Sequence, residues 1–387
     1  MTASKRRVAI SITDGYVPGI DAAIAGVVLS ASHLGWEVVG IRDGFDGLLC
    51  PEQYPDGGVF SIAPESVEHE TSAVSARLGT TGRLNPFRVR HINVDNFVEE
   101  VDRSDELLGA IRDHGIDGLI VVADTRGIST LFQLNRKGLK TVCVPKSVEN
   151  DLPHTALSFG FNSALSFATD MLTRVRQAAE SARKIGVVEV PGEHAGWLAL
   201  QAGLAVCANA VFIPEIAYDV CNCKVAAELR PKLEAGSGSG LVVVAEGAKP
   251  VDEPADTTAE PIDPMRATLS PGSTDASGAH VIHRSGRVAE TVALQLQRCT
   301  DHETYPLVLG QLVKGGPPSA VDRQLGLGYG AGAVRALSEG RSGVMVAFQP
   351  PDLAFVPLAE TINNFRTIPA DSLLVQTARS LGILLGD

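Results

Sequence analysis

Short apolar runs alternate with helical stretches along most of the 387 residues. Each run is rich in Val, Ile and Leu. A turn follows the run, and after the turn comes a stretch in which apolar residues recur at three- and four-residue spacing. This is the pattern of strand, loop and amphipathic helix. Strands are predicted at Arg7–Ile12, Glu37–Ile41, Asp117–Val122, Thr141–Val144, Lys184–Val190, Val211–Ile213 and Leu241–Ala245, with a further element at Val308–Leu312. Helices are predicted at Asp21–His33, Ser104–His114, Ser129–Lys137, Ser163–Ser181, Gly196–Ala208, Val225–Ala235 and Ala289–Gln297.

This alternation predicts an α/β fold built on doubly wound parallel sheets. The run Asp117–Val122 has the continuous apolar character of a strand inside a parallel sheet. The chain is longer than a typical single domain, so two domains are expected. Ligands of such folds bind beyond the carboxyl ends of the strands, so the loops after Ile12, Val122, Val144, Val190 and Ala245 are the candidate sites.

Composition excludes several classes of function. The chain has 33 basic and 45 acidic residues, a formal net charge of −12, so neither nucleic acid nor an anionic membrane is an expected partner. A phosphate would need a local basic pocket. The six cysteines are scattered and predict neither a disulfide framework nor a zinc site. With no apolar run long enough for a signal peptide or a membrane span, a cytoplasmic location is expected.

The loop from Val144 to Pro153 carries the densest candidate chemistry. It holds Lys146, Glu149, Asn150 and Asp151 directly after a predicted strand. The carboxylates can deprotonate a hydroxyl, and the lysine can neutralise a phosphoryl group. The alternative is a polar turn in which Asn150 and Asp151 cap the next element, and the spacing alone does not separate the two.

Several motifs in order extend this loop into a resemblance that covers nearly the whole chain. They are PGIDAAIAGVV at 18–28, PKSVEND at 145–151, FGFNSAL at 159–165, VVEVPGEHAG at 187–196, IPEI at 213–216, VAEGA at 244–248 and LGQLVKGG at 309–316, with Asp322 and Arg323 behind them. Their order and spacing resemble the 6-phosphofructokinase family, whose equivalents include PKTIDND, VVEVMGRHAG and LGHxQRGG.

The resemblance implies two doubly wound α/β domains with a cleft between them. Residues 1–150 with about 315–370 would form the donor-side domain, and residues 151–314 with the C-terminal tail the substrate-side domain. The Pro-rich stretch 249–279 would be an insertion, either a surface excursion or a lid over a site. Dimers or tetramers are implied, in which a neighbouring subunit completes the sugar-phosphate site. The implied reaction moves a phosphoryl group from ATP or pyrophosphate, with Mg²⁺ and no organic cofactor, to the 1-hydroxyl of fructose 6-phosphate.

Residue by residue, the resemblance implies a catalytic set and a substrate set. Glu149 stands where the family has its aspartate base, Asp151 matches directly, and Lys146 matches the lysine of pyrophosphate-using members. The implied substrate residues are Ser147, Lys184, Pro191, Gly192, Glu193, Glu246, Tyr305, Gln311 and Lys314. Among these, Lys184, Glu193, Tyr305 and Lys314 stand for arginines and Gln311 for a histidine, so bidentate guanidinium contacts are lost.

The donor side departs further from the family. Asp14, Gly15 and Tyr16 occupy the position of a glycine-rich phosphate turn, and Arg77 matches an arginine near the transferred group. Asp14 places a carboxylate where a polyphosphate would lie. In the run ADTRG at 123–127, Thr125 replaces the aspartate that holds Mg²⁺, Asp124 lies one residue earlier, and Arg126 and Gly127 complete the loop.

Two hypotheses follow. The first is a phosphotransferase acting on a sugar phosphate or similar small phosphorylated compound, with pyrophosphate favoured over ATP because Lys146 is kept and the nucleotide turn is not. The second is a non-catalytic or repurposed paralogue that binds a phosphorylated metabolite or a partner subunit.

Overall fold

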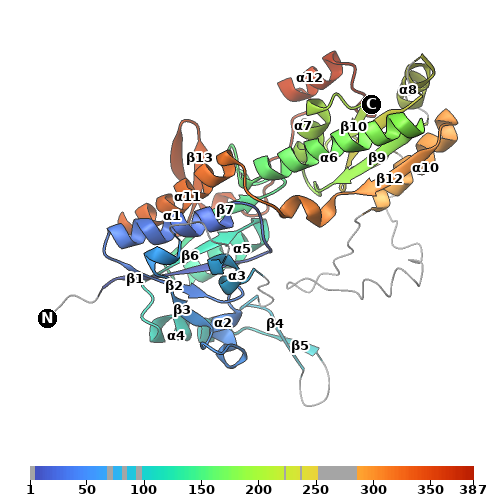
Figure 1. Cartoon of the computed structure of the whole chain (residues 1–387). Coiled ribbons are helices and arrows are strands. Elements are labelled where there is room, and N and C mark those ends of the chain that lie inside the picture. The colour runs from blue at the N-terminus through green and yellow to red at the C-terminus, as the bar shows by residue number, and fades with distance from the viewer. Residues whose placement is uncertain are drawn as a thin grey trace.

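The computed structural model describes residues 5–67, 73–80, 85–92, 98–221, 224–235, 238–251 and 286–387. Two sheets form the cores of two units, and a small antiparallel hairpin projects from the first (Figure 1). Most of the predicted insertion at 249–279 lies outside the described residues. Within the described part of the chain, no helix is long and apolar enough to cross a membrane.

The large sheet has the order β14-β13-β7-β6-β1-β2-β3, with β8 paired to β7. Its central strands are parallel, whereas β3 and β14 run antiparallel at its two edges. The bounds are β1 Arg7–Ile12, β2 Glu37–Ile41, β3 Val59–Ser61, β6 Gly118–Ala123, β7 Thr141–Ser147, β8 Phe159–Gly160, β13 Val344–Gln349 and β14 Asp352–Pro357. The hairpin consists of β4 Val89–Ile92 and β5 Val98–Val101.

The small sheet is entirely parallel, in the order β10-β11-β9-β12. Its strands are β9 Ile185–Val190, β10 Ala210–Phe212, β11 Gly240–Ala245 and β12 Thr304–Val308. Every residue of β9, β10 and β11 is buried, which explains their uninterrupted apolar sequences, because both faces of a parallel sheet are covered.

Helices cover both faces of each sheet, so the expectation of doubly wound α/β units is confirmed. Alternate residues of β1 pack toward α1 and α11 on one face and toward α4 and α5 on the other. In the small unit, α6 and α7 cover one face, and α8 and α10 the other. The helices are α1 Ile20–His33, α2 Asp46–Leu49, α3 Ala73–Leu78, α4 Ser104–Asp113, α5 Thr125–Arg136, α6 Phe161–Ala182, α7 Trp197–Ala205, α8 Lys224–Ala235, α10 Arg287–Thr300, α11 Ala320–Ser338 and α12 Leu373–Ser380.

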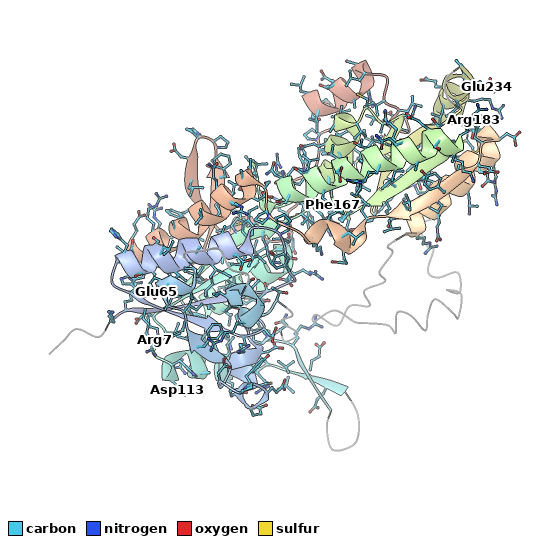
Figure 2. All side chains as sticks on the ribbon, viewed as in Figure 1. Arg7, Glu65, Asp113, Phe167, Arg183 and Glu234 are labelled. Atoms are coloured by element: carbon cyan, nitrogen blue, oxygen red, sulfur yellow. A yellow bond between two sulfur atoms is a disulfide. The ribbon has the colours of Figure 1, made fainter. Side chains whose placement is uncertain are left out.

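The two units are joined where α6 begins. Helix α6 starts beside the large sheet and runs along the small one, with Phe167 near the junction and Arg183 at the far end (Figures 1 and 2). The fully buried Asp322 of α11 accepts hydrogen bonds from the Ser163 amide at 2.7 Å and from Asn162 Nδ2 at 3.3 Å. A carboxylate at a helix N-terminus satisfies amides that have no partner within the helix, so Asp322 ties the start of α6 to the large unit.

After β14 the chain returns to the small unit. Helix α12 packs on α7, and Leu384 forms a bridge with Ala210 of β10. The C-terminus therefore lies beside the small sheet (Figure 1). The sequence-based division near residues 150 and 314 remains a proposal.

Three expectations need correction. The element at Val308–Leu312 is instead strand β12 followed by a 3-10 helix at Gly310–Lys314. The sheets are not purely parallel, since β3 and β14 are antiparallel edge strands. Cys221 and Cys299 form a disulfide across 78 residues, although the scattered cysteines predicted none. Their separation in the sequence gave no sign that the fold brings the start of α8 close to the end of α10.

Helices α1 and α11 approach closely enough that only glycine fits between them. A Cβ atom at Gly330 would overlap the carbonyl oxygen of Ala23, whereas one at Gly328 in the same helix would lie 3.8 Å from the nearest atom, a methyl of Leu353. We expect Gly330→Ala to lower the free energy of unfolding by about 1 to 3 kcal/mol, because overpacking forces the helices apart.

Gly328→Ala is the matched control in this test. It adds the same methyl group to the same helix, so urea denaturation should show no loss, or a gain of up to about 1 kcal/mol from helix propensity. Equal losses in both variants would contradict the close packing of α1 on α11.

Candidate active site

The loop after β7 is tightly wound by its own side chains. Ser147 Oγ donates a hydrogen bond to Asp151 Oδ1 at 2.6 Å and accepts one from the Glu149 amide at 3.0 Å. Asn150 has a positive φ of 55°, which amide and acid side chains tolerate best among non-glycine residues, and its Oδ1 accepts from the Ser158 amide at 3.0 Å. Asn150 therefore serves the turn, as the alternative interpretation of this loop expected, and the catalytic role of Glu149 and Asp151 stays a prediction.

Glu149 reaches across to the small unit. Its Oε2 accepts a hydrogen bond from the Glu193 amide at 3.1 Å, and the preceding amide, of Gly192, donates to Glu246 Oε1 at 3.3 Å. Gly192 has a φ of 152°, and a Cβ there would lie 2.9 Å from the Ala195 carbonyl oxygen. Only glycine fits this position without strain, so the turn after β9 presents two consecutive amides to two carboxylates from different strands.

These carboxylates are mutually destabilised as anions. Burial, followed by the charges of Asp151 and Glu246, raises the pKa of Glu149 to about 8, while the Glu193 amide and Lys314 oppose the shift. Burial also raises the pKa of Asp151 and of Glu246. A carboxyl group with a pKa near the operating pH, such as that of Glu149, is suited to act as a general base.

On the donor side, Lys146 holds the turn after β1. Its side chain is only 1% exposed, and Nζ donates to the carbonyl oxygens of Asp14 at 3.0 Å and Gly15 at 2.8 Å. Asp14 has a φ of 61°, so the turn points consecutive carbonyls at the amine. Burial lowers the pKa of Lys146, while Asp124 and Asp14 raise it.

The start of α5 closes on the same turn. Asp124 caps the helix, with its Oδ1 accepting from the amides of Arg126 at 3.0 Å and Gly127 at 3.4 Å. A Cβ at Gly127 would lie 2.5 Å from Thr13 Oγ1 and 2.8 Å from Asp14 Oδ2. Both of these oxygens are buried and lack a hydrogen-bond partner within the described part of the chain. Burial, followed by the charge of Asp124, raises the pKa of Asp14 to about 6.

Two carboxylates and an unpartnered buried oxygen suit a divalent cation that shares donor phosphates. Mg²⁺ is commonly held by one or two carboxylates together with phosphate oxygens and water, and Asp14 and Asp124 supply such a pair. Within the described residues, no group of three or more His, Cys, Asp or Glu side chains could hold a metal ion by itself. Thr125, the first residue of α5, contributes no carboxylate.

The other predicted site residues divide into two groups. Lys314 lies close enough to Glu149, Glu246 and Lys146 to affect their pKa values. Pro191 is buried beside Gly192, and Gln311 is exposed. Burial raises the pKa of Tyr16, beside Asp21.

Lys184, Tyr305 and Arg77 lie apart from this cluster and have other partners. Lys184 forms an ion pair with Glu303 at 2.6 Å, and Tyr305 Oη donates to the Val175 carbonyl at 3.1 Å. Lys184 precedes β9 and Gly192 follows it, and a strand of that length separates them by about 20 Å. Arg77 forms an ion pair with Asp56 at 3.2 Å and stacks on Phe60 at 3.8 Å.

A C-terminal segment outside the sequence motifs also contacts these loops. The Arg366 amide donates to the Asp151 carbonyl at 2.7 Å, its carbonyl accepts from Trp197 Nε1 at 2.6 Å, and its guanidinium lies 4.1 Å over the Trp197 ring. Nothing in the spacing of residues 361–368 marks them as part of the site.

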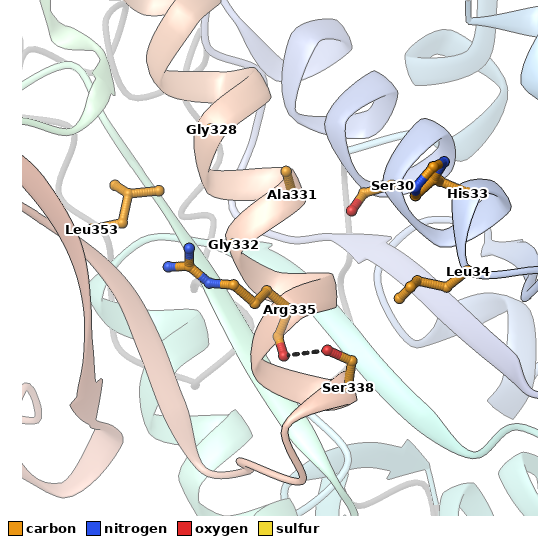
Figure 3. A pocket seen from close by; sticks show the side chains of 9 residues that line it. All are labelled: Ser30, His33, Leu34, Gly328, Ala331, Gly332, Arg335, Ser338 and Leu353. Carbon is orange, nitrogen blue, oxygen red and sulfur yellow. Dashed lines mark hydrogen bonds between the residues drawn. The ribbon is translucent and has the colours of Figure 1, made fainter.

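A groove of about 460 Å³ lies elsewhere, between α1 and α11 (Figure 3). Its lining includes His33, Leu34, Gly328, Arg335 and Leu353. Its lining includes no acidic side chain and none of the loops described above.

These features define an α/β protein of two doubly wound units with an acid/base site where their loops meet. A family model described as Phosphofructokinase matches residues 7–337, and the chain belongs to the phosphofructokinase family. It is 35% identical over 393 residues to the ATP-dependent 6-phosphofructokinase of Chloroflexus aurantiacus, covering 100% of this chain and 99% of that protein. The ATP-dependent 6-phosphofructokinase 1 of Synechocystis is 32% identical, covering 99% of each chain.

Solved structures share the fold. Phosphofructokinase from Saccharomyces cerevisiae matches with a TM-score of 0.70 and 22% identity, over 98% of this chain and 47% of that one. Pyrophosphate-dependent phosphofructokinase from Nitrosospira multiformis matches with a TM-score of 0.69 and 19% identity, over 99% of this chain and 93% of that one. The expected fold and family are therefore confirmed.

The raised pKa of Asp14 makes stability depend on pH. Asp14 has a pKa of about 6 in the folded chain and of about 3.9 when unfolded, so its ionisation costs folding free energy as the pH rises from about 4 to 6. Above that range the cost is constant. We expect Asp14→Asn, measured by urea denaturation in EDTA, to raise the free energy of unfolding by about 1 to 3 kcal/mol at pH 7.5 and by less at pH 5.

Asp170→Asn is the control for this measurement. Asp170 is exposed on α6 and pairs with Arg174 at 3.0 Å, so its loss should change stability by less than about 1 kcal/mol. An equal gain from Asp14→Asn at both pH values would contradict the assigned shift.

Proposed function

We propose that this protein is a phosphotransferase that moves a phosphoryl group to the 1-hydroxyl of fructose 6-phosphate or a closely similar sugar phosphate. The observation that carries the proposal is Glu149, a half-buried residue whose carboxyl group has a pKa of about 8 and is held between the two units. Membership of the phosphofructokinase family, and relatives that are named 6-phosphofructokinases along their full length, support the substrate.

In the proposed step, Glu149 takes the proton of the sugar hydroxyl. The hydroxyl oxygen then forms a bond to the donor's terminal phosphorus, while the bond from that phosphorus to the leaving phosphate breaks. The Glu193 amide fixes Oε2 of Glu149, so Oε1 is the oxygen left to accept the proton. Asp151, oriented by Ser147 Oγ at 2.6 Å, is placed to bind the same hydroxyl or a water beside it. Lys146 and Lys314 supply positive charge near the transferred group.

The phosphate of the sugar is proposed to bind Lys314 together with Lys184 and Tyr305 of a second subunit. Within one chain, Lys184 and Tyr305 lie at the end of the small sheet opposite Gly192 and Glu246. A complete pocket therefore requires a homodimer or homotetramer with its sites at the subunit interface.

The proposed donor is pyrophosphate rather than ATP, with Mg²⁺ held by Asp14 and Asp124. When bound, the cation would neutralise phosphate charge beside these carboxylates. Lys146 supports pyrophosphate, since it is the lysine that distinguishes pyrophosphate users in the resemblance. The relatives named above are ATP-dependent, so the donor is the part of the proposal that most needs a direct assay.

A second candidate function, the binding of a phosphorylated metabolite without turnover, rests on one observation. The amides of Arg126 and Gly127 are already bonded to Asp124, and the Lys146 amine to two backbone carbonyls. Groups that would receive a donor phosphate thus have partners within the chain, and turnover by the wild-type protein decides between the two candidates.

We expect Glu149→Gln to lower kcat by about 10²-fold or more while fructose 6-phosphate still binds, because the amide keeps the shape and cannot accept the proton. In the wild type, kcat should rise with pH and level off above about pH 8, where Glu149 is ionised. Initial rates with pyrophosphate and with ATP, together with calorimetric titration of the sugar phosphate, measure both effects.

Glu180→Gln, an exposed change on α6, controls for loss of one carboxylate and should leave kcat unchanged. Unaltered turnover in Glu149→Gln would remove this loop from the mechanism. No turnover by the wild type, with sugar phosphate bound, would favour the binding function.

The cation site has a variant that spares the helix cap. Asn caps helices about as well as Asp, so Asp124→Asn should keep α5 intact while removing a charge that the cation needs. We expect the Mg²⁺ concentration for half-maximal turnover to rise by about tenfold or more, measured in parallel with pyrophosphate and with ATP. An unchanged Mg²⁺ requirement would exclude Asp124 as a ligand, and a higher kcat/KM with ATP would overturn the proposed donor.

A further inference from the structure

The segment Phe365–Ile368 crosses between the two units and contacts loops of both. It follows the edge strand β14 of the large sheet and precedes α12, which packs on the small unit. On one side it meets the loop that carries Glu149, and on the other it meets the turns after β9 and β10.

Toward the large unit, Arg366 binds two consecutive carbonyl groups. Its amide donates to the Asp151 carbonyl at 2.7 Å, and its Nη1 donates to the Asn150 carbonyl at 3.4 Å. Asn150 has a φ of 55°, which turns the backbone so that both carbonyls meet one residue. The same loop places the Glu149 and Asp151 carboxylates, so Arg366 holds their backbone directly.

Toward the small unit, the segment is fastened by polar and aromatic contacts. Trp197 Nε1 donates to the Arg366 carbonyl at 2.6 Å, and the Arg366 guanidinium lies 4.1 Å over the Trp197 ring. The Ile368 amide donates to Glu215 Oε1 at 2.8 Å, and Glu215 also accepts from the Gly196 amide at 3.1 Å. Phe365 packs against His194 with 4.0 Å between ring centroids.

The Arg366 guanidinium itself is half-buried and has no ion pair within the described part of the chain. Burial is the one cause that lowers its pKa. A desolvated charge without a carboxylate partner costs folding free energy, and the cation–π contact with Trp197 offsets only part of that cost. Arginine at this position is therefore poorly explained by stability, whereas its two contacts with the base loop give it a task.

We propose that Arg366 is a positioning residue that holds the Glu149 loop against the 192–193 turn, so that the base of the large unit stays aligned with the sugar-binding turn of the small unit. This inference rests on the proposed function, because the alignment matters only for proton abstraction from a sugar bound in that place. The hydrogen bonds to the Asn150 and Asp151 carbonyls both come from Arg366. Replacing Arg366 therefore frees the loop without removing any group that touches the sugar. Misplacement of a reacting group by about 1 Å is enough to lower turnover by about 10²-fold.

The test compares Arg366→Ala with Arg366→Lys in steady-state kinetics. We expect Arg366→Ala to lower kcat by about 10- to 100-fold and to change KM for fructose 6-phosphate by less than about threefold. Arg366→Lys keeps a charged donor but loses the planar group that stacks on Trp197, so it should recover part of the lost turnover. Arg341→Ala is the matched control, since Arg341 also lies over an aromatic ring, Phe355 at 5.1 Å, but remote from this loop.

The pH profile separates positioning from a purely structural role. A loosened loop exposes Glu149, whose pKa is raised by burial, by Asp151 and by Glu246 and lowered by Lys314, so the rise of kcat with pH should move to lower pH in Arg366→Ala. Loss of a nearby positive charge alone would move it to higher pH. A reduced melting temperature with an unchanged kcat per folded molecule and an unshifted profile would overturn the inference.

Two further measurements keep the inference testable. If Arg366→Ala does not fold, Trp197→Phe takes its place. This change keeps an aromatic ring and removes the hydrogen bond to the Arg366 carbonyl. It should lower kcat by about threefold or more with KM nearly unchanged. Hydrogen exchange of peptides covering residues 147–151 and 191–197 should accelerate in Arg366→Ala and not in Arg341→Ala. Failure of the wild type to turn over refutes the proposed function alone, whereas unchanged exchange and kinetics in the Arg366 variants refute this inference alone.

Discussion

The contact on which the site depends is the hydrogen bond between the Glu193 amide and Glu149. It joins a loop of the large sheet to a turn of the small one at 3.1 Å, and it places a carboxylate among two others that raise its pKa. Of the two acids, Asp151 belongs to the same loop as Glu149, whereas Glu246 follows a strand of the small sheet. The pKa of Glu149 therefore depends on groups from both units, although the amide that joins the units itself lowers this pKa.

The acceptor and donor sides of the site differ in how far their polar groups are already satisfied. On the acceptor side, Glu149 and Asp151 each have one carboxylate oxygen engaged, by the Glu193 amide and by Ser147 Oγ respectively. On the donor side, Lys146 and the first amides of α5 bond within the chain. A donor phosphate must replace those bonds, and each exchange recovers little net free energy because one hydrogen bond is traded for another. Asp14 Oδ2 is the exception, since it is buried and has no hydrogen-bond partner within the described part of the chain.

The sequence predicted correctly the strands that are almost completely buried. Strand β1 was predicted with its observed bounds, and the predicted strand at Thr141–Val144 lies within β7, because continuous apolar runs are typical of parallel strands buried on both faces. Helix α11 was not assigned, since its four glycines at 326, 328, 330 and 332 lower helix propensity. Close packing on α1 explains two of them, Gly326 and Gly330. Strand β12 was missed because it is half-exposed and contains Pro306, so it shows neither alternation nor a continuous apolar run.

The same distinction applies to the site. The compact motif around Glu149 and Asp151 could be picked out because its polar residues lie within one loop. Arg366 could not, because it contacts residues 150 and 151 from more than 200 positions later in the chain, and no local pattern encodes such a separation. Asp124 shows the converse case. The sequence marked it as a weak metal ligand, and the structure gives it a helix to cap as well. The cap uses Oδ1, and Oδ2 lies 3.8 Å from Arg126 Nη2. In the proposed function, a donor phosphate and its cation would therefore replace contacts that stabilise the fold, and the affinity for the donor would depend on how much of that stabilisation they replace.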